Sequence, residues 1–303
     1  MASGKEIKAR IKSIKNTGKI TKAMELISTV KMKKSQESVL SLRPFALAAL
    51  QILSRVSHEE SVLGNYGVSP VDATRELIIL VAAQKGLCGG YNVNVFKKAT
   101  EYIRDDIDTP YTHEYDYITV GKRSRDFILR TGQSMLADFS DEIKDPLTVA
   151  ESRRIVRFAI SEWQTGKYSK LSIIYNHYVS AITQLPVVKT IFPINQADID
   201  LFLTKSAGKI LQKETLASYT IEPDIATIVD YTIPMILDAM IHETLLESRA
   251  SEHAARMVAM KNAKDSANKK WASLTLIYNK ARQWAITKEV SEIVSGVESM
   301  KDI

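Results

Sequence analysis

Residues that constrain or break a chain are scarce in this sequence, and each shortage excludes a class of protein. Among 303 residues there is one cysteine, Cys88, which excludes an internal disulfide and any zinc site built from several cysteines. The longest apolar run of strand character, residues 77–83, is far too short to cross a bilayer. Lys5 and Lys8 near the start are followed by no apolar stretch, which does not fit a secretory signal. The sequence therefore predicts a protein that is soluble or peripheral to a membrane, in a reducing compartment.

Glycine and proline are missing from residues 235–295, a run of about 60 residues rich in Ala, Leu, Met, Lys and Glu. This composition predicts one unbroken helix, about 90 Å long at 1.5 Å per residue. The core of a chain of this size cannot enclose such a rod, so a partner is expected to cover it. Its apolar residues step by three and four, which indicates a narrow seam for one partner helix: Trp271, Leu274, Tyr278, Ala281 and Ala285. Upstream, the same side carries small residues that let a second backbone approach closely: Ser248, Ser251, Ala255, Ala259, Ala263 and Ala267.

A second amphipathic helix is predicted over residues 5–42, at the other end of the chain. Its apolar positions again step mostly by three and four: Ile7, Ile11, Ile14, Ile20, Met24 and Ile27. Pro44 is expected to kink or interrupt this helix, and the pattern fades near residues 64–70. Neither terminal helix can bury its apolar stripe alone, so the two are predicted to wind around each other as an antiparallel pair.

The segment between the terminal helices alternates strand and helix. Strands are predicted over residues 76–83, 115–121, 171–179 and 185–191, and helices over residues 93–103 and 147–163. This alternation predicts a mostly parallel sheet with an antiparallel edge from the last two strands. The expected fold class is α/β: a long antiparallel coiled coil of the N- and C-terminal helices, with a Rossmann-like α/β domain inserted between them. The expected domains are the N-terminal helix of the coiled coil, the α/β domain and the long C-terminal helix, at residues 1–69, 70–205 and 206–303.

Positive charge is concentrated at the N-terminus. Residues 1–34 carry ten Lys or Arg and two Glu, whereas the whole chain has a net charge of only +6. Such a field attracts nucleic acid, anionic lipid or an acidic protein surface, unless it is simply a solvated helix face. One hypothesis is therefore a basic coiled coil that binds nucleic acid or acts as a scaffold. Against nucleic acid, residues 1–44 contain no Phe, Tyr or Trp that could stack on bases.

No group of residues in the sequence has the spacing of an active site. The loop GLCGG at residues 86–90 lies between a predicted strand and a predicted helix, but it fits neither the dinucleotide nor the P-loop pattern, so a tight turn is expected. Cys88 has no histidine near it in the sequence, which favours a packed thiol. His242 and Glu243 begin an H-E-x-x-H pattern, but residue 246 is leucine, so the zinc interpretation fails. We expect no catalytic residue, metal or cofactor, and a nucleotide-dependent α/β enzyme is the weakest alternative.

Three segments nevertheless resemble one family, the gamma subunit or central rotor shaft of F-type ATP synthase. In the order of that family they are KEIKARIKSIKNTGKITKAMELISTVKMKKSQ, GLCGGYN, and ESRASEHAARMVAMKNAKDSANKK followed by LTLIYNKARQWAITKEVSEIVSG. The resemblance implies a helical shaft that turns inside a ring of three alpha and three beta subunits and couples the flow of H⁺ or Na⁺ to ATP synthesis. It also implies contacts with the epsilon subunit and the membrane c-ring. It implies no nucleic acid, no small-molecule substrate and no active site in this chain.

The resemblance implies roles for residues on both terminal helices. Arg282 and Gln283 match family residues that hydrogen-bond a loop of the beta subunit, and Thr287 lies on the same outward side. Met24 and Arg256 match positions that are tied to the coupling between rotation and catalysis. All five are expected to contact the alpha and beta ring or to transmit its motion.

The resemblance also implies a foot and a location. Tyr219 and Glu222 match the part of the family that touches the c-ring. Trp284 stands where the family usually has a small residue, and we predict that it packs on the N-terminal helix. Because the first helix is expected to begin at once, the resemblance implies a bacterial protein, peripheral on the cytoplasmic face of the plasma membrane. The alternative is a mature protein on the matrix side of the mitochondrial inner membrane.

Overall fold

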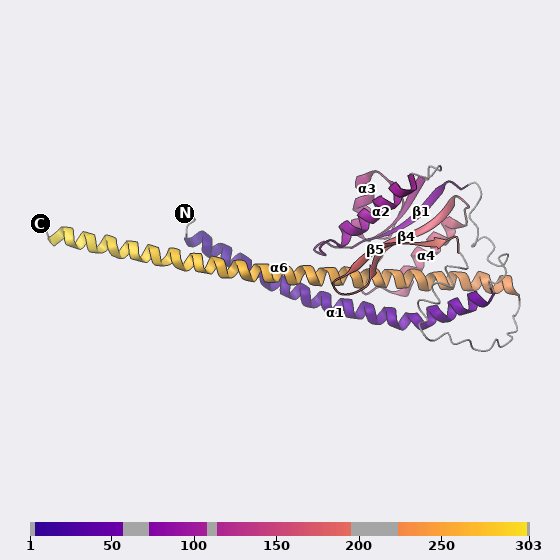
Figure 1. Ribbon diagram of the computed structural model, residues 1–303, viewed down its shortest axis with the longest axis horizontal. Coiled ribbons are helices and arrows are strands. Elements are labelled where there is room, and N and C mark those ends of the chain that lie inside the picture. Colours follow the sequence, from indigo (N-terminus) through magenta and orange to yellow (C-terminus); the bar gives the residue numbers. More distant parts are fainter. Residues whose placement is uncertain (1–3, 57–72, 108–113, 195–223, 302–303) are drawn as a thin grey trace. The chain divides into compact units, whose positions relative to one another are not determined.

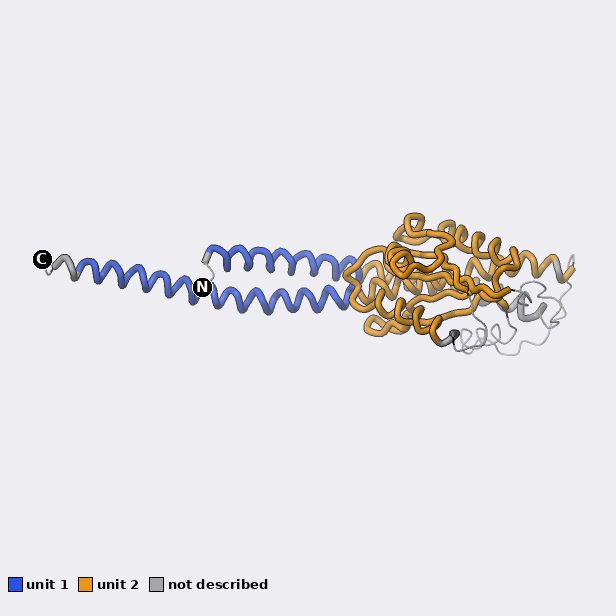
Figure 2. The backbone as a smooth tube through the Cα atoms, turned by 90° about the horizontal axis from the view of Figure 1, so that it is seen from above, with its two compact units in different colours: residues 1–28, 256–303 blue, residues 29–255 orange. Residues whose placement is uncertain are grey.

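The computed structural model describes residues 4–56, 73–107, 114–194 and 224–301 (Figure 1). The chain forms two compact units, residues 1–28 with 256–303 and residues 29–255 (Figure 2). We call the first the helical unit and the second the α/β unit. The terminal helices α1 (Gly4–Val56) and α6 (Ile225–Lys301) each contribute to both units.

A five-stranded sheet forms the centre of the α/β unit (Figure 1). Its strands are β1 (Arg75–Val81), β2 (Glu114–Val120), β3 (Ser134–Asp138), β4 (Tyr168–Tyr178) and β5 (Gln184–Phe192), in the order β3-β2-β1-β4-β5. β1 pairs in parallel with β2 and β4, β2 pairs in parallel with β3, and β5 is antiparallel to β4. The predicted mostly parallel sheet with an antiparallel edge is therefore confirmed. β3 and the preceding helix α3 (Lys122–Thr131) were not predicted.

Helices cover both faces of this sheet. On one face α4 (Val149–Trp163) and the first part of α6 pack on the strands, and the ring of Trp163 stacks on Phe192 at 4.9 Å. On the other face lie α2 (Tyr91–Ile107) and α3, where Phe96 and Phe127 stack at 4.3 Å. Apolar layers on both faces explain why β1 is a continuous apolar run and does not alternate.

The carboxyl ends of β1 and β2 pack closely together. Gly121 follows β2 with a φ of 102°, and a Cβ on it would collide with the carbonyl oxygen of Ala82, so only glycine fits there. In the glycine-rich loop after β1, Leu87 and Gly89 have φ values of 64° and 57°, which confirms the predicted tight turn. The thiol of Cys88 in this loop is buried, as predicted.

The helical unit pairs the start of α1 with the second half of α6 (Figure 2). Glu25 Oε2 lies 2.7 Å from Lys264 Nζ, and a Cβ built on Gly18 would lie 3.7 Å from the Cβ of Ala267. Residue numbers thus fall along α1 as they rise along α6, so the two helices are antiparallel. This confirms the predicted pairing of the terminal helices.

The buried side of α1 in the helical unit is only partly the predicted one. The prediction was wrong for Ile20 and Ile27, whose side chains are 62% and 56% exposed. The neighbouring Thr21 and Ser28 are buried in their place. The other four predicted apolar residues of α1 are buried or half-buried. Small side chains let the two backbones approach closely near residues 21 and 28, which explains why the larger neighbours turn outward there.

The seam predicted on α6 is confirmed over part of its length. Leu274, Tyr278 and Ala281 are half-buried, whereas Trp271 and Ala285 are exposed. From residue 282 to residue 297 every side chain is exposed. The helix itself is longer than predicted, because it begins at Ile225 and continues through proline 234 and glycine 296. α1 likewise continues through the proline at position 44.

Candidate functional site

The two residues predicted to act in coupling lie on opposite helices of the helical unit. Met24 of α1 is half-buried, and Arg256 of α6 is 8% exposed. The pairing of Glu25 with Lys264 sets the register, which places Met24 at the level of Lys264. Arg256 lies about two helical turns further along α6. The structure thus puts both residues in the helical pair, at successive levels.

An ion pair that the sequence did not predict joins the two helices beside Met24. The side chains of Glu25 and Lys264 are 18% and 24% exposed. The hydrogen bond to Glu25 is the main cause that raises the pKa of Lys264 above its ordinary value, so the ammonium group stays charged at physiological pH. The sequence does not indicate this ion pair, because which charged residues of α1 and α6 face each other depends on the register of the two helices.

The three residues predicted to contact the ring lie together on the exposed stretch of α6. Arg282, Gln283 and Thr287 are all exposed. The Thr287 hydroxyl donates to the Gln283 carbonyl oxygen at 2.9 Å, which satisfies it within the helix. The guanidinium of Arg282 and the side-chain amide of Gln283 are accessible to a partner.

Trp284 does not pack on α1 as predicted. Its side chain is 59% exposed, and Lys288 Nζ lies 5.7 Å from the centre of its ring, within the range of a cation–π contact. The register explains the difference. With Glu25 beside Lys264, the first described residue of α1, Gly4, reaches only the level of Trp284, so no described turn of α1 is left to cover the indole.

Other predictions fall on parts of the chain outside the described residues. Tyr219 and Glu222, predicted to form the foot, lie in the range 195–223. The predicted domain boundaries near residues 69 and 205 also lie outside the described residues. All of these stay predictions.

In the α/β unit one carboxylate binds both terminal helices. Asp145 Oδ2 accepts a hydrogen bond from Lys31 Nζ of α1 at 2.8 Å and lies 3.3 Å from His253 Nε2 of α6. Hydrogen bonding by His253, and then by Lys31, holds the pKa of Asp145 well below its usual range. The sequence did not indicate this cluster, because its three members come from distant parts of the chain.

A serine and a histidine lie within hydrogen-bonding distance inside the α/β unit, but both are too buried to act on a substrate. Ser152 Oγ lies 2.9 Å from His242 Nδ1, and both side chains are buried. Burial lowers the pKa of His242. The hydroxyl donates to the carbonyl oxygen of Val149 at 2.9 Å, so the ring nitrogen is the donor to Ser152. No substrate reaches this pair, which instead joins α4 to α6.

The carboxyl edge of the sheet is where doubly wound folds bind nucleotides, and here it is filled by the chain itself. Gln84 Nε2 donates to the carbonyl oxygen of Ser140, and Gln84 Oε1 accepts from the backbone N–H of Lys122 at 3.1 Å. The backbone N–H of Lys122, a donor that a phosphate at this edge could use, is therefore paired within the protein. In the described ranges, no group of His, Cys, Asp and Glu side chains could hold a metal ion.

The helices also lack the character of membrane spans. Within the parts of the chain that the structure describes, none of them is both long enough and apolar enough to cross a bilayer.

Comparison with known proteins covers nearly the whole chain. The ATP synthase family model matches residues 3–300. The ATP synthase gamma chain of Pelotomaculum thermopropionicum is 37% identical over 309 residues, which cover 99% of this chain and 100% of that relative. The gamma chain of Chloroflexus aurantiacus is 35% identical over 305 residues and 99% of both chains. That of Xanthomonas campestris is 33% identical over 301 residues, 99% of this chain and 100% of the relative.

Solved structures of mitochondrial ATP synthases share the fold. A chain from the OSCP, F1 and c-ring assembly of Euglena gracilis has a TM-score of 0.60 at 17% identity and covers 98% of this chain and 95% of its own length. A chain from the central stalk and c-ring of Tetrahymena thermophila has a TM-score of 0.57 at 21% identity, with coverages of 80% and 99%. The family match and the relatives above 30% identity along the full length show that this chain belongs to the family of ATP synthase gamma chains.

Proposed function

We propose that this chain is the central-stalk gamma subunit of an F-type ATP synthase. It turns inside a ring of alpha and beta subunits and couples the flow of H⁺ or Na⁺ through the membrane sector to ATP synthesis in the ring. The chemistry belongs to the ring. This chain contributes a rigid helical pair and the side chains that meet its partners.

The exposed end of α6 is the observation that carries this proposal. Beyond residue 281 every side chain as far as residue 297 is exposed. Apolar side chains still follow the helical period there, at steps of four, three and four: Ile286, Val290, Ile293 and Val297. A single helix that exposes an apolar stripe needs a partner to cover it. A surrounding sleeve of subunits supplies that cover, and the side chains of Arg282 and Gln283 supply hydrogen bonds at its edge.

The finer partner assignments rest on the family resemblance. The alpha and beta subunits surround the helical unit, while the epsilon subunit and the c-ring meet the foot near Tyr219 and Glu222. A subunit held in this way is peripheral, at the cytoplasmic face of a bacterial plasma membrane. The bacterial relatives of similar length support that location.

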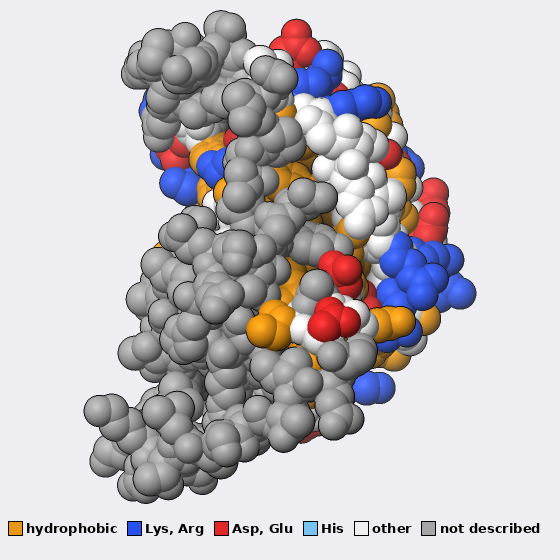
Figure 3. All heavy atoms as spheres, turned by 90° about the vertical axis from the view of Figure 1, so that its right-hand side faces the viewer, with side chains coloured by type: hydrophobic (Ala, Val, Ile, Leu, Met, Phe, Trp, Pro, Cys, Tyr) orange, Lys and Arg blue, Asp and Glu red, His pale blue; other side chains and the backbone are white. Residues whose placement is uncertain are grey.

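The alternative of a coiled coil that binds nucleic acid or acts as a scaffold gains no support from the family match. The described part of one face of the α/β unit does not favour it either. On the described part of the face shown in Figure 3, acidic and basic side chains both lie beside hydrophobic ones. Nucleic-acid binding relies instead on a surface of one charge.

The test is assembly with the ring. The full chain is expressed with alpha and beta subunits, and we expect it to co-purify with a ring that has ATPase activity. Arg282→Ala with Gln283→Ala should leave the fold unchanged and lower coupled ATP synthesis about tenfold, since each hydrogen bond lost removes roughly 0.5 to 3 kcal/mol. Lys269→Ala with Lys270→Ala, at exposed positions of the same helix, is the matched control. A chain that never associates with the ring, or equal rates in all three proteins, would contradict the proposal.

A further inference from the structure

One carboxylate binds both terminal helices close to where they leave the α/β unit. The unit ends at Thr29 on α1 and at Ala255 on α6, and Lys31 and His253 lie two residues inside these limits. Both contact Asp145, whose Oδ2 accepts a hydrogen bond from Lys31 Nζ at 2.8 Å and lies 3.3 Å from His253 Nε2. Asp145 therefore joins the two helices to the α/β unit at the point where they leave it.

The loop that carries Asp145 is fixed to the rest of the unit. It connects β3 to α4, and the side chain of Ile143 in this loop is buried in the apolar core. Gln84 Nε2 donates to the carbonyl oxygen of Ile143 at 3.4 Å. After the loop, the backbone N–H of Thr148 donates to Glu151 Oε2 at 2.9 Å, which caps the start of α4. A side chain on a loop with this support can hold a partner in one position.

The two helices are attached to the α/β unit in different ways. α6 contributes a row of apolar side chains to the core on one face of the sheet: Val229, Ile233, Ile236, Leu237, Ile241 and Leu245. Of residues 29–42 of α1, all of which the structure describes, Met32 and Val39 alone are buried. Apolar contact is non-directional and lets a packed helix slide, whereas a hydrogen bond holds one geometry. α1 is therefore the helix that depends more on its polar contact with Asp145.

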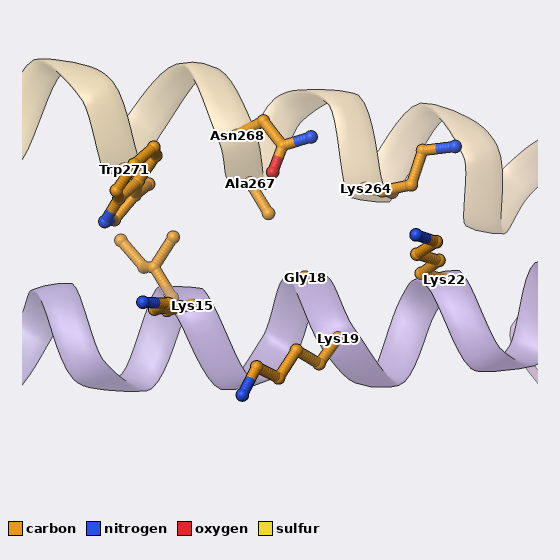
Figure 4. Close-up of a pocket in the computed structure, with 9 residues that line it drawn as sticks. Lys15, Gly18, Lys19, Lys22, Lys264, Ala267, Asn268 and Trp271 are labelled. Carbon is orange, nitrogen blue, oxygen red and sulfur yellow. The ribbon is translucent and has the colours of Figure 1, made fainter.

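A twisting load on the helical unit acts on both helices. They pack closely there, and Figure 4 shows Ala267 and Asn268 of α6 pointing toward Gly18 of α1. The load is therefore shared and reaches the α/β unit through both attachments. Unless α1 is held where it enters the α/β unit, its share of the load moves α1 against α6 and does not turn the unit.

We propose that Asp145 is a positioning residue for coupling, which holds α1 on the α/β unit so that both helices and the unit turn as one body under load. This inference rests on the proposed function, since only a shaft carries such a load. Hydrogen bonding by His253, and then by Lys31, holds the pKa of Asp145 well below its usual range, so the carboxylate stays charged in a cell. The side chain of His253 is 4% exposed, whereas that of Lys31 is 41% exposed. The contact with α1 can thus be removed at Lys31 without opening the core.

The experiment compares loaded and unloaded turnover in the assembled enzyme. Lys31→Met keeps an unbranched side chain and removes the hydrogen bond to Asp145. In vesicles that contain the membrane sector, this variant should lower ion-driven ATP synthesis by at least about twofold, since one lost hydrogen bond changes an opening equilibrium by roughly two- to tenfold. ATP hydrolysis by the detached ring with the same chain should be unchanged, because no load acts on the α/β unit there.

Three further variants separate the role of this contact from a general effect on the fold. Lys33→Met is the matched control and should change neither rate, because Lys33 is exposed on the same helix and the same charge is lost. Lys31→Arg should restore most of the synthesis rate, since a guanidinium also donates to a carboxylate. Asp145→Asn should lower synthesis as well. Adding Lys31→Met to it should lower the rate no further, because both changes remove the same contact.

Equal synthesis rates in Lys31→Met and Lys33→Met would overturn the inference. A Lys31→Met chain whose detached ring loses hydrolysis in the same proportion would also overturn it, since that loss reflects the fold and not slip under load. If Lys31→Met does not assemble, Asp145→Asn is compared with Asp141→Asn in the same way, and equal synthesis rates again overturn the inference. A parent chain that does not assemble with the ring would instead contradict the proposed function, which keeps the two failures apart.

Discussion

In the α/β unit, the single side chain of Asp145 contacts both terminal helices. It accepts from Lys31 of α1 and lies beside His253 of α6. We expect Asp145→Asn to lower the free energy of unfolding by about 1.5 to 3 kcal/mol at pH 7, the typical range for a hydrogen bond to a charged group. Urea unfolding followed by circular dichroism measures this. Asp141→Asn is the control, because the side chain of Asp141 is 71% exposed in its pair with Lys122, and such pairs contribute little.

The pH dependence of the same variant follows from the lowered pKa of Asp145. Its ordinary pKa is 3.8, and the folded protein holds it well below that. The stabilisation is therefore complete above pH 3.8 and is lost as the pH falls from there toward the pKa of the folded state. The difference between the parent and Asp145→Asn should be large at pH 7 and smaller at pH 3. A difference that is the same at both pH values would mean that the carboxylate charge is not what stabilises the cluster.

The close approach of α1 and α6 in the helical unit can be tested through Gly18. A Cβ there would meet Ala267 Cβ at 3.7 Å and Asn268 Oδ1 at 3.8 Å, both ordinary contacts. Gly18→Ala should therefore stabilise the helical pair by about 0.5 to 1 kcal/mol, the usual gain when glycine leaves a helix interior. Gly296→Ala is the matched control, since a Cβ on Gly296 meets nothing within 4 Å. Loss of helix signal at a lower temperature in Gly18→Ala would show that the helices are closer than described.

Neighbouring residues of α1 provide a second test of the same element. Ser28 is buried and Ile27 is 56% exposed. Ser28→Leu should destabilise the pair by about 1 to 3 kcal/mol through overpacking, whereas Ile27→Ser should change the isolated chain by less than about 0.5 kcal/mol. Thermal unfolding of both variants measures the contrast. If Ile27→Ser destabilised the protein more than Ser28→Leu, Ile27 would be the buried residue, as the apolar pattern alone predicted.

The sequence predicted where helices and strands lie better than it predicted which of their side chains are buried. Long segments with a clear period, such as residues 235–295, were recognised as helix because no breaker interrupts them. The seam of α1 was only partly predicted, since counting apolar residues favours Ile20 and Ile27 over Thr21 and Ser28. A closely packed pair reverses that preference, because small residues bury best where backbones approach. Which residues of α1 are buried depends on the register between α1 and α6, and that register is set by contacts between residues distant in the sequence.

Two elements of the α/β unit were missed for a different reason. α3 has the sequence KRSRDFILRT, with few apolar residues, and β3 is five residues long and only partly buried. Short elements at the margin of a sheet bury too little to impose a period on the sequence. Of the candidate site, the family resemblance supplied Arg282, Gln283 and Thr287. It could not supply the Glu25–Lys264 pair, which arises from the pairing of the two helices.

For the molecule as a whole, the pairing of α1 with α6 predicts that they move as one body in the helical unit. The distance of 3.7 Å between a Cβ on Gly18 and Ala267 Cβ suits a disulfide, for which about 3.5 to 4.5 Å is usual. Gly18→Cys with Ala267→Cys, in a Cys88→Ala background, should form a cross-link within one chain on oxidation. If the proposed function holds, ATP synthesis by the assembled complex should be the same in the oxidised and reduced forms. Synthesis that stops only on oxidation would mean that the two helices must move past each other.

The exposed end of α6 also bears on how a cell matches the supply of this chain to that of its partners. From residue 282 to residue 297 the helix has no buried side chain, so packing does not stabilise this end of α6 and it opens more readily than the paired part. A segment that frays open is the preferred substrate of proteases. Copies left outside a ring should thus be digested from this end, while copies inside one are shielded. Surplus chains would be removed, and the number of shafts would follow the number of rings.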